Sequence, residues 1–271
     1  MYKKYWKLSE KPFCYRVEVG DLYRSRSVQA ALLRLRYCID NNAGLAMLLG
    51  ASGVGKSSLI RLLQAEDEGL RPFVHIAAPR LSPQELARAV ACELMETETV
   101  DGLSPEVLLV KQQQHLRRCA ENGQHPVIVF DEAHLFGNET LNDVVLPLLN
   151  LAETDYSLQF SVVLCGQPVL GSHVGRNAQL RERIAVTASM SGFSEKETGD
   201  YIRCRMEHAG GDVGVFSDGA VAAVQDLSGG NPRRINRLCD MALLVGYSDQ
   251  ASLICAEDIE ALATEILPAA A

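Results

Sequence analysis

The chain of 271 residues carries 26 lysines and arginines against 34 aspartates and glutamates, which gives a formal net charge of −8. Hydrophobic residues make up 47% of it and charged residues 22%, a globular composition that excludes a disordered, collagen-like or low-complexity chain. With roughly 150 residues per domain, one large domain or two small ones are expected. The acidic balance removes the simplest argument for nucleic-acid binding, which is a strongly basic domain.

The chain shows no sign of a membrane segment or of a disulfide framework. No apolar run approaches the roughly 20 residues that a membrane-spanning helix needs. The first residues, from Met1 to Lys7, lack the apolar core of a signal peptide. The eight cysteines are irregularly spaced without a C-x-x-C pair, so we expect reduced core thiols and no zinc site. These features predict a cytoplasmic protein that would reach a membrane only through a partner.

Short apolar runs alternate with longer helical patterns in the first part of the chain. A run that is apolar at almost every position is typical of a strand buried on both faces of a parallel sheet. The candidate strands, the last being the weakest, are 45–49, 73–77, 127–130, 160–165 and 184–188. Between them, Ser82 and Ser104 each precede a proline at a first helical position, which predicts helices toward Met95 and Ala120. This alternation indicates a doubly wound α/β domain.

The pattern changes near Gly192, after which no strand candidate of comparable strength follows. Three polar residues are placed to cap helices: Ser194, Ser217 and Asn231. A further helix is expected over 256–267. We therefore predict an α/β domain over residues 1–191, followed by an all-helical domain over residues 192–271.

The first apolar run leads into a glycine-rich segment, Gly-Ala-Ser-Gly-Val-Gly-Lys-Ser, which matches G-x-x-x-x-G-K-[ST] at every fixed position. Its glycines let backbone N–H groups point at phosphate oxygens, and the N-terminus of the following helix adds partial positive charge. We expect Lys56 to reach the β- and γ-phosphates and the Ser57 hydroxyl to ligate Mg²⁺. The residues predicted to bind nucleotide here are Gly50, Ala51, Ser52, Gly53, Val54, Gly55, Lys56, Ser57 and Ser58.

The third apolar run ends in two acidic residues, Asp131 and Glu132. Ligands bind at the carboxyl ends of parallel strands, so Asp131 is expected beside the phosphate loop, where it would hold Mg²⁺ through water. Glu132 is expected to orient or deprotonate the attacking water. A glutamate directly after the aspartate favours an ATPase over a small-molecule kinase, and the chain has no N-K-x-D guanine motif. The following Ala-His completes the letters DEAH without other helicase motifs, so His134 is expected to be structural.

The chain resembles AAA+ ATPases of the ExeA/GspA type, a group associated with general secretion and pilus assembly. Beyond the two nucleotide motifs, the resemblance is carried by residues 5–8, 11–13, 22–23, 164–168, 180–184, 193–202 and 228–236. The segments Leu-Cys-Gly-Gln-Pro at 164–168 and Gly-Asn-Pro-Arg at 230–233 are the most specific of these. The resemblance implies an AAA+ parallel sheet with flanking helices, a small helical lid domain, and ATP with Mg²⁺ as ligands.

The resemblance also implies three further site residues. Gln167 would be the sensor-1 polar group near the attacking water. Arg183, with Arg181 as the alternative, would be an arginine finger that acts on the ATP of a neighbouring subunit in a homo-oligomer. Arg233 would be the sensor-2 arginine, reaching from the lid toward the γ-phosphate and thus contributing to both nucleotide binding and catalysis.

Two features of the lid and the N-terminal segment follow from the same resemblance. The lid would close when Arg233 meets the γ-phosphate and open after hydrolysis. Its long helix carries one apolar stripe, expected to pack on the lid core, formed by Ile235, Leu238, Ala242 and Val245. Pro12, Phe13 and Tyr23 resemble the adenine-side entrance of the family, or they form a core cluster.

Three functions remain open on the sequence. The first is a cytoplasmic ATPase of the secretion or pilus-assembly type that oligomerises through the Arg183 face and remodels a protein partner. The second is a DNA-associated ATPase regulator of the transposition type, which the net charge of −8 disfavours. The third is a nucleotide-gated scaffold with little turnover, against which the intact Lys56, Asp131 and Glu132 argue. Secretion members often add a transmembrane helix and a peptidoglycan-binding region, which these residues lack, so we expect the secretion role not to carry over unchanged.

Overall fold

The computed structural model describes residues 2–14, 22–67, 69–77, 81–97, 100 and 102–266, with side chains up to Leu262 at the C-terminal end. The chain divides into two compact units. We call them the helical unit, which comprises Met1–Ser25, Gly53–Ser58 and Ser191–Ala271, and the sheet unit, which comprises Arg26–Ser52 and Leu59–Met190.

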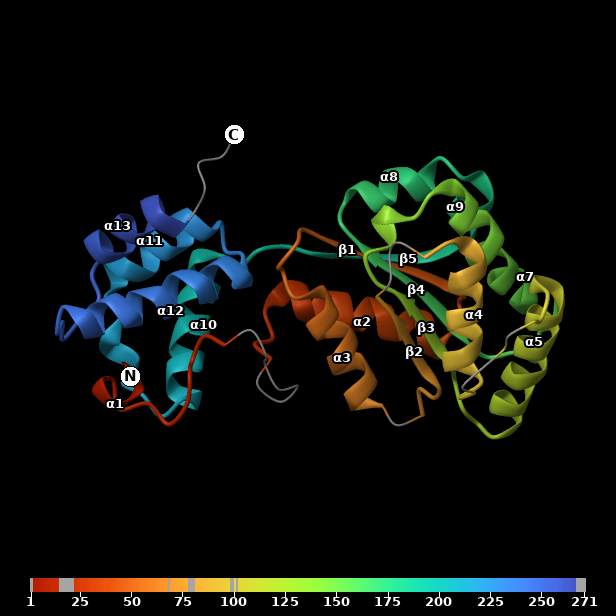
Figure 1. Ribbon diagram of the computed structural model, residues 1–271, viewed down its shortest axis with the longest axis horizontal. Helices are drawn as coiled ribbons and strands as arrows, with labels where there is room; N and C mark the ends of the chain where they lie inside the picture. Colours follow the sequence, from red (N-terminus) through yellow and green to blue (C-terminus); the bar gives the residue numbers. More distant parts are fainter. Residues whose placement is uncertain are drawn as a thin grey trace. The chain divides into compact units, whose positions relative to one another are not determined.

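The sheet unit is built on a five-stranded, parallel sheet with the strand order β2-β3-β4-β1-β5 (Figure 1). The strands are β1 (Leu45–Gly50), β2 (Phe73–Ile76), β3 (Val127–Phe130), β4 (Ser161–Gly166) and β5 (Ile184–Met190). The central strands β3 and β4 are buried at every position, as their continuous apolar runs predict, whereas the edge strand β5 alternates between exposed and buried positions. All five predicted strands are confirmed.

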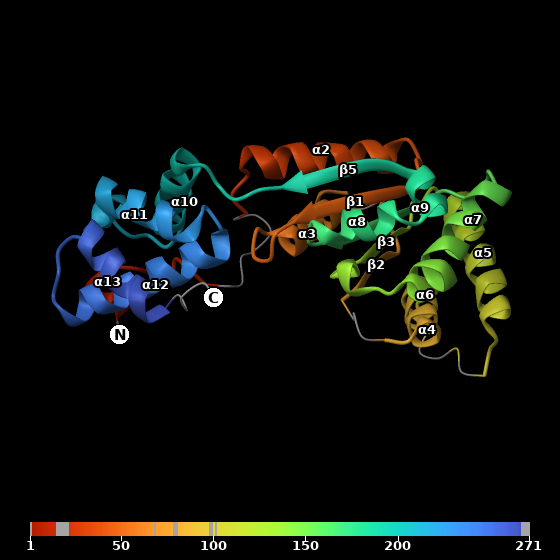
Figure 2. The same ribbon diagram turned by 90° about the horizontal axis from the view of Figure 1, so that it is seen from above.

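Helices cover both faces of the sheet. α2 packs on β5 and β1, and α3 lies on the same side, while α8 and α9 lie on the opposite side (Figures 1 and 2). Right-handed crossovers between parallel strands produce this two-sided cover. The elements are α2 (Arg26–Asp40), α3 (Lys56–Glu66), α4 (Pro83–Leu94), α5 (Pro105–Glu121), η2 (Ala133–Leu135), α6 (Asn138–Thr140), η3 (Leu141–Val145), α7 (Leu146–Thr154), α8 (Val169–Gly175) and α9 (Ala178–Arg183).

Helix α4 begins where the sequence predicts. The Ser82 hydroxyl accepts a hydrogen bond from the Glu85 N–H, and the Glu85 carboxylate accepts one from the Ser82 N–H. The two bonds form the expected capping box, which satisfies two backbone donors at the helix start. The Ser82 hydrogen bonds also lower the pKa of the Glu85 carboxyl, because they favour its charged form.

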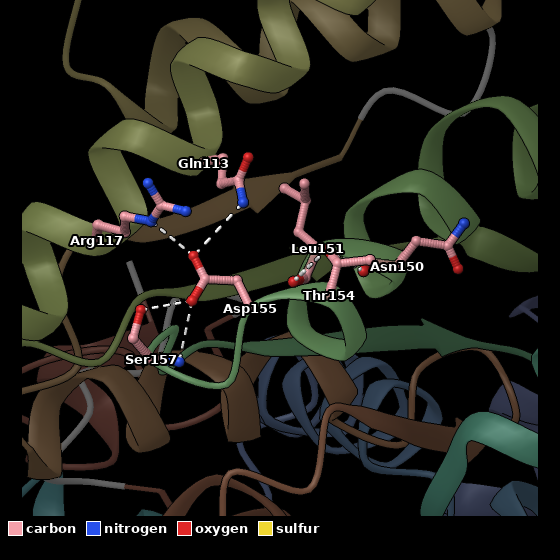
Figure 3. A network of polar contacts seen from close by, with 7 residues as sticks. All are labelled: Gln113, Arg117, Asn150, Leu151, Thr154, Asp155 and Ser157. Atoms are coloured by element: carbon pink, nitrogen blue, oxygen red, sulfur yellow. Dashed lines mark hydrogen bonds and ion pairs between the residues drawn. The ribbon is translucent and has the colours of Figure 1, made fainter.

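The end of α7 is tied to α5 by the carboxylate of Asp155 (Figure 3). Its Oδ2 accepts from Arg117 Nε at 2.6 Å and lies 3.5 Å from Gln113 Nε2. Its Oδ1 accepts from the Ser157 hydroxyl at 2.6 Å and from the Ser157 N–H at 3.1 Å. The Ser157 hydroxyl and then Arg117 stabilise the charged form, which lowers the pKa of Asp155 to about 2.

The helical unit has a core of its own. It contains α1 (Tyr2–Tyr5), α10 (Glu195–His208), η4 (Val213–Val215), α11 (Asp218–Ser228), α12 (Pro232–Ser248) and α13 (Ala256–Ile266). Leu267, the predicted end of the last helix, lies outside the described residues. The apolar stripe of α12 packs as expected: Ile235, Leu238 and Ala242 are buried, and Val245 is partly buried against the same cluster.

The first residues of the chain pack into the helical unit. Trp6 is 6% exposed, and its Nε1 donates a hydrogen bond to the Leu243 carbonyl on α12 at 2.8 Å. Helix α1 contacts α12 as well. The N-terminal segment thus groups with the C-terminal helices, which no local sequence pattern predicts, and the domain division at residue 191 remains a prediction.

Aromatic rings from the N-terminal segment complete this core. Phe13 is 2% exposed and meets Phe216 edge to face, with ring centroids 5.9 Å apart. Tyr23 meets Phe193 and Tyr201 in the same way, at 5.3 and 5.8 Å. The structure therefore places Phe13 and Tyr23 in a core cluster, one of the two roles that the sequence leaves open.

Within the described part of the chain, every helix is too short or too polar to cross a membrane.

Candidate nucleotide-binding site

Predicted site residues of the sheet unit lie along one edge of the sheet. Strand β1 ends at Gly50, and Asp131 and Gln167 directly follow the ends of β3 and β4. Because all strands are parallel and β4 lies between β1 and β3, these positions share the carboxyl edge. Ligands bind at this edge in open α/β sheets. The strand order therefore supports the sequence prediction of one site.

The glycine-rich loop continues from this edge into α3. It spans residues 51–55, between the end of β1 and the start of α3 at Lys56. Gly53 and Gly55 have φ angles of 86° and 99°, and such left-handed positions turn consecutive N–H groups toward a common centre. The loop leads directly into the N-terminus of α3, where the helix dipole favours negative charge, and Lys56 is 5% exposed. This geometry and chemistry fit a bound phosphate.

Within the helical unit, the loop meets the start of α12. The Asn231 side chain caps this helix as predicted, accepting from the Arg233 N–H at 3.1 Å and the Arg234 N–H at 3.4 Å. The Arg233 N–H also approaches the Gly53 carbonyl at 3.4 Å. A Cβ on Gly53 would lie 2.7 Å from Asn231 Oδ1 and 2.9 Å from Arg233 Cβ, so only glycine fits. The predicted sensor-2 segment thus lies against the phosphate loop.

Asp131 is a buried carboxylate with several hydrogen-bond partners. It is 4% exposed, and its N–H donates to the Ile76 carbonyl at 2.9 Å. Its Oδ1 accepts from the Glu132 N–H at 2.9 Å, and its Oδ2 lies 3.3 Å from His75 Nε2 on β2. A carboxylate at the carboxyl edge provides the oxygen ligand that Mg²⁺ or its water shell requires, so the donor set fits the predicted ion. His75 is not among the predicted site residues.

Glu132 and Gln167 are linked through His134. Glu132 has a φ of 54°, which is uncommon for a residue with a side chain, and its side chain is 43% exposed. Its Oε2 lies 3.4 Å from His134 Nδ1, and His134 Nε2 lies 3.1 Å from Gln167 Nε2. The structure thus joins two predicted catalytic residues through a third that the sequence marks only as structural. The available signal was its place, two residues after the acidic pair.

The predicted arginine finger lies at the opposite edge of the sheet. Arg183 ends α9 and precedes β5, whose first residue Ile184 is in register with Leu45 at the start of β1. Arg181, the alternative, is exposed on α9. The Arg183 guanidinium donates to three partners in its own unit, namely Gln179 O at 2.9 Å, Asn150 Oδ1 at 2.9 Å and Glu153 Oε2 at 2.6 Å. The structure therefore does not bring Arg183 to the edge that carries its own phosphate loop.

The central part of the chain matches a known protein-family model. Residues 39–172 match the family model described as "AAA domain". The matched region contains the glycine-rich loop, the acidic pair after β3, and Gln167 after β4. The match supports the predicted P-loop fold for this part of the chain.

A curated relative extends the similarity beyond the AAA domain. The chain is 30% identical over 268 residues to General secretion pathway protein A of Aeromonas hydrophila. The match covers 98% of this chain and 48% of the relative, so the chain spans about half the length of that protein. The similarity confirms the resemblance to the ExeA/GspA type that the motifs predict.

Solved structures share the fold at low sequence identity. Cdc6p from Pyrobaculum aerophilum matches with a TM-score of 0.74 at 18% identity, over 96% of this chain and 72% of that one. The RuvB Holliday junction branch migration motor of Thermotoga maritima matches with a TM-score of 0.57 at 19% identity, over 90% and 69%. At such identities the likeness concerns the fold alone. It confirms the predicted AAA+ fold class.

Proposed function

We propose that this protein binds ATP with Mg²⁺ at the carboxyl edge of its sheet and hydrolyses it to ADP and phosphate. The observation that carries the proposal is the convergence of Gly50, Asp131 and Gln167 at the ends of strands β1, β3 and β4. A phosphate-binding loop, an acidic pair and a polar side chain at one edge are the parts that P-loop ATP hydrolysis requires.

Each part of the site has a distinct role. The backbone N–H groups of 50–58 bind the phosphates, and Lys56 adds a positive charge at the β- and γ-phosphates. Ser57 holds Mg²⁺ directly and Asp131 holds it through water. When bound, Mg²⁺ neutralises charge that develops on the phosphate oxygens. Arg233 reaches the γ-phosphate from α12, so the lid closes on ATP and is released when the γ-phosphate is lost.

Glu132 and Gln167 act on the water. Glu132 orients the water molecule and accepts its proton as the water oxygen attacks the γ-phosphorus. The bond between the γ-phosphorus and the bridging oxygen breaks, and ADP carries away the electron pair. Gln167 fixes the water from the neighbouring strand end. Since proton acceptance and water positioning occur at this step, changes at these residues affect turnover more than nucleotide affinity.

We assign Arg183 to the ATP of a neighbouring copy in a homo-oligomer. Its place at the amino edge puts it away from the edge with its own phosphate loop, so action between subunits is the arrangement that this position favours. Turnover would then couple to the remodelling of a protein partner, for which the GspA similarity favours a secretion or pilus component. A cytoplasmic site of action fits the eight cysteines, all described and joined by no disulfide.

DNA is not proposed as the partner. Some solved structures of this fold are complexes with DNA, such as that of the Aeropyrum pernix ORC1 protein at 20% identity, but that identity supports the fold only. The net charge of −8 argues against a DNA-binding face, because such faces neutralise phosphates with Lys and Arg.

The test compares nucleotide binding and ATP turnover in four forms of the full chain. Glu132→Gln should lower kcat by about 100-fold or more with nucleotide affinity retained, since it removes the base but no phosphate contact. Lys56→Ala should weaken nucleotide binding itself. Glu139→Gln, a change at an exposed glutamate on α6, is the matched control and should equal wild type. Equal turnover in all four forms, or no Mg-ATP binding by wild type in calorimetry, would contradict the proposal.

A further inference from the structure

We propose that His134 is a positioning residue that holds Glu132 and Gln167 in one chain of polar contacts, so that both face the same attacking water. The inference rests on the proposed function and deepens it. His134 lies in η2 (Ala133–Leu135), one short turn after the acidic pair, and its sequence position alone predicts only a structural role.

The placement of the His134 ring carries the argument. Its side chain is 8% exposed, whereas the Glu132 side chain that it approaches is 43% exposed. Both ring nitrogens have polar neighbours: Nδ1 lies 3.4 Å from Glu132 Oε2, and Nε2 lies 3.1 Å from Gln167 Nε2. A ring that only filled the core would meet apolar atoms at these positions. Its two polar contacts are with two different residues of the proposed chemistry.

The neighbours of the ring differ in which of its nitrogens they need protonated. A carboxylate only accepts hydrogen bonds, and an amide nitrogen only donates them. A neutral imidazole with its proton on Nδ1 accepts from the Gln167 amide and points a donor nitrogen at Glu132, whose Oε2 lies 3.4 Å away. The Gln167 backbone N–H lies 3.5 Å from Nδ1 and can bond to it only when that nitrogen carries no proton, so this contact competes with the one to Glu132. The 3.4 Å contact with Glu132 is long, as is common before a substrate binds.

The contacts with His134 leave one oxygen atom of each neighbour available to water. Gln167 contacts His134 through its amide nitrogen, so its side-chain carbonyl oxygen is free to accept a hydrogen bond. Glu132 contacts His134 through Oε2, so its Oε1 can accept one as well. A water molecule has two donors, so it can meet both acceptors at once, and His134 sets the spacing between them. Misplacement of such a group by about 1 Å costs on the order of 100-fold in rate.

The backbone builds this juxtaposition at Gly166. A Cβ on Gly166, the last residue of β4, would lie 3.1 Å from His134 N and 3.3 Å from His134 Cβ. A side chain at this position would be in tight contact with η2, so glycine favours the close approach of η2 to the end of β4. The contact joins the turn after β3 to the end of β4, so His134 bridges two neighbouring strand ends.

The experiment measures kcat and KM for ATP, affinity for a fluorescent ATP analogue, and thermal stability of the full chain. His134→Ala and Gln167→Ala should each lower kcat by about tenfold or more while nucleotide affinity stays within about twofold of wild type. The double variant should be no slower than the slower single variant, because each change breaks the same chain. His134→Asn keeps a donor close to the Nδ1 position and should recover part of kcat. His173→Ala, on α8, is the control and should match wild type.

The outcomes separate this inference from the proposed function. An unchanged kcat in His134→Ala, with or without a lower melting temperature, would overturn the positioning role and leave the ATPase proposal intact. Losses in His134→Ala and Gln167→Ala that add in full in the double variant would also overturn it. A fall in nucleotide affinity that accounts for the whole loss would overturn it too. A wild-type chain that binds no nucleotide would overturn the proposed function together with this inference.

Discussion

At the end of β3, Asp131 and Glu132 are neighbours in the chain yet occupy different environments. Asp131 is 4% exposed and hydrogen-bonded on both carboxylate oxygens, whereas the Glu132 side chain is 43% exposed. The backbone of Glu132 is left-handed, with a φ of 54°, which turns the chain sharply out of the strand. Such strain costs on the order of 1–3 kcal/mol and is found mostly at functional sites. The turn at Glu132 leaves the Asp131 carboxylate buried, where it can bind a cation, and the Glu132 carboxylate open to solvent, where it can contact water.

At the same scale, Asp155 should make the stability of the chain depend on pH. Its folded pKa is lowered from 3.8 to about 2, so its charge stabilises the folded state above pH 3.8, and this contribution is lost as the pH falls toward 2. In urea unfolding, Asp155→Asn should therefore be less stable than wild type at neutral pH, and the difference should shrink below about pH 4. Asp143→Asn, at an exposed position on η3, is the control. A difference that stays constant down to the folded pKa would contradict the assignment.

At the scale of elements, the junction of α7, α9 and β5 presents the proposed arginine finger. Arg183 pairs with Glu153 on α7, and its side chain is 22% exposed against 56% for Glu153. A hollow of about 430 Å³ lies beside the pair, and Tyr156 on its rim is 93% exposed. The Arg183 Nε atom is buried and has no hydrogen-bond partner among the described residues. These features are compatible with the docking of a neighbouring copy at this junction.

The two members of this ion pair should differ in their effect on turnover. Arg183→Ala should abolish the rise of ATPase activity with protein concentration, because it removes the charge that stabilises the neighbour's transition state. Glu153→Ala breaks the same pair and leaves the arginine, so it should retain that rise. An exposed pair contributes only about 0–1 kcal/mol, so neither change should unfold the chain. Equal losses in both variants would assign the pair a structural role instead of a catalytic one.

At the scale of the whole molecule, each compact unit has a separate core. The sheet unit buries Leu164 on β4, and the helical unit buries Leu238 on α12, both with 0% exposure. Trp6 is the single tryptophan of the chain and lies in the core of the helical unit. Its fluorescence therefore reports on that unit, whereas circular dichroism reports on both.

These positions allow the stability of the two units to be measured apart. Leu238→Ala should lower the stability of the helical unit by about 2–5 kcal/mol and shift the Trp6 fluorescence transition to lower denaturant. Leu164→Ala, an equal truncation in the other core, should shift the circular dichroism transition more than the fluorescence transition. Identical shifts of both signals in both variants would show that the units unfold as one.

Local features were predictable from the sequence because their signals are local. The continuous apolar runs identify β3 and β4 most clearly, since burial on both faces leaves almost no polar position in a strand, whereas the edge strand β5 gives the weakest signal. Ser82 followed by Pro83 and Glu85 identifies the start of α4, because capping requires those residues within one helical turn. The glycine-rich loop and the acidic pair are recognisable for the same reason, as their chemistry depends on fixed spacings along the chain. Helix α2 and the grouping of the N-terminal segment carry no comparable signal.

The sequence by itself thus determined the strands, the helix starts, the phosphate-binding loop and the position of Asp131 and Glu132 at a strand end. Only the tertiary structure decided that β4 lies between β1 and β3, that Trp6 packs on α12, and that His134 links Glu132 to Gln167. The physical reason is that hydrophobic periodicity records whether a residue is buried but not which distant residue buries it. That choice depends on the packing of whole elements, which residues far apart in the chain decide together.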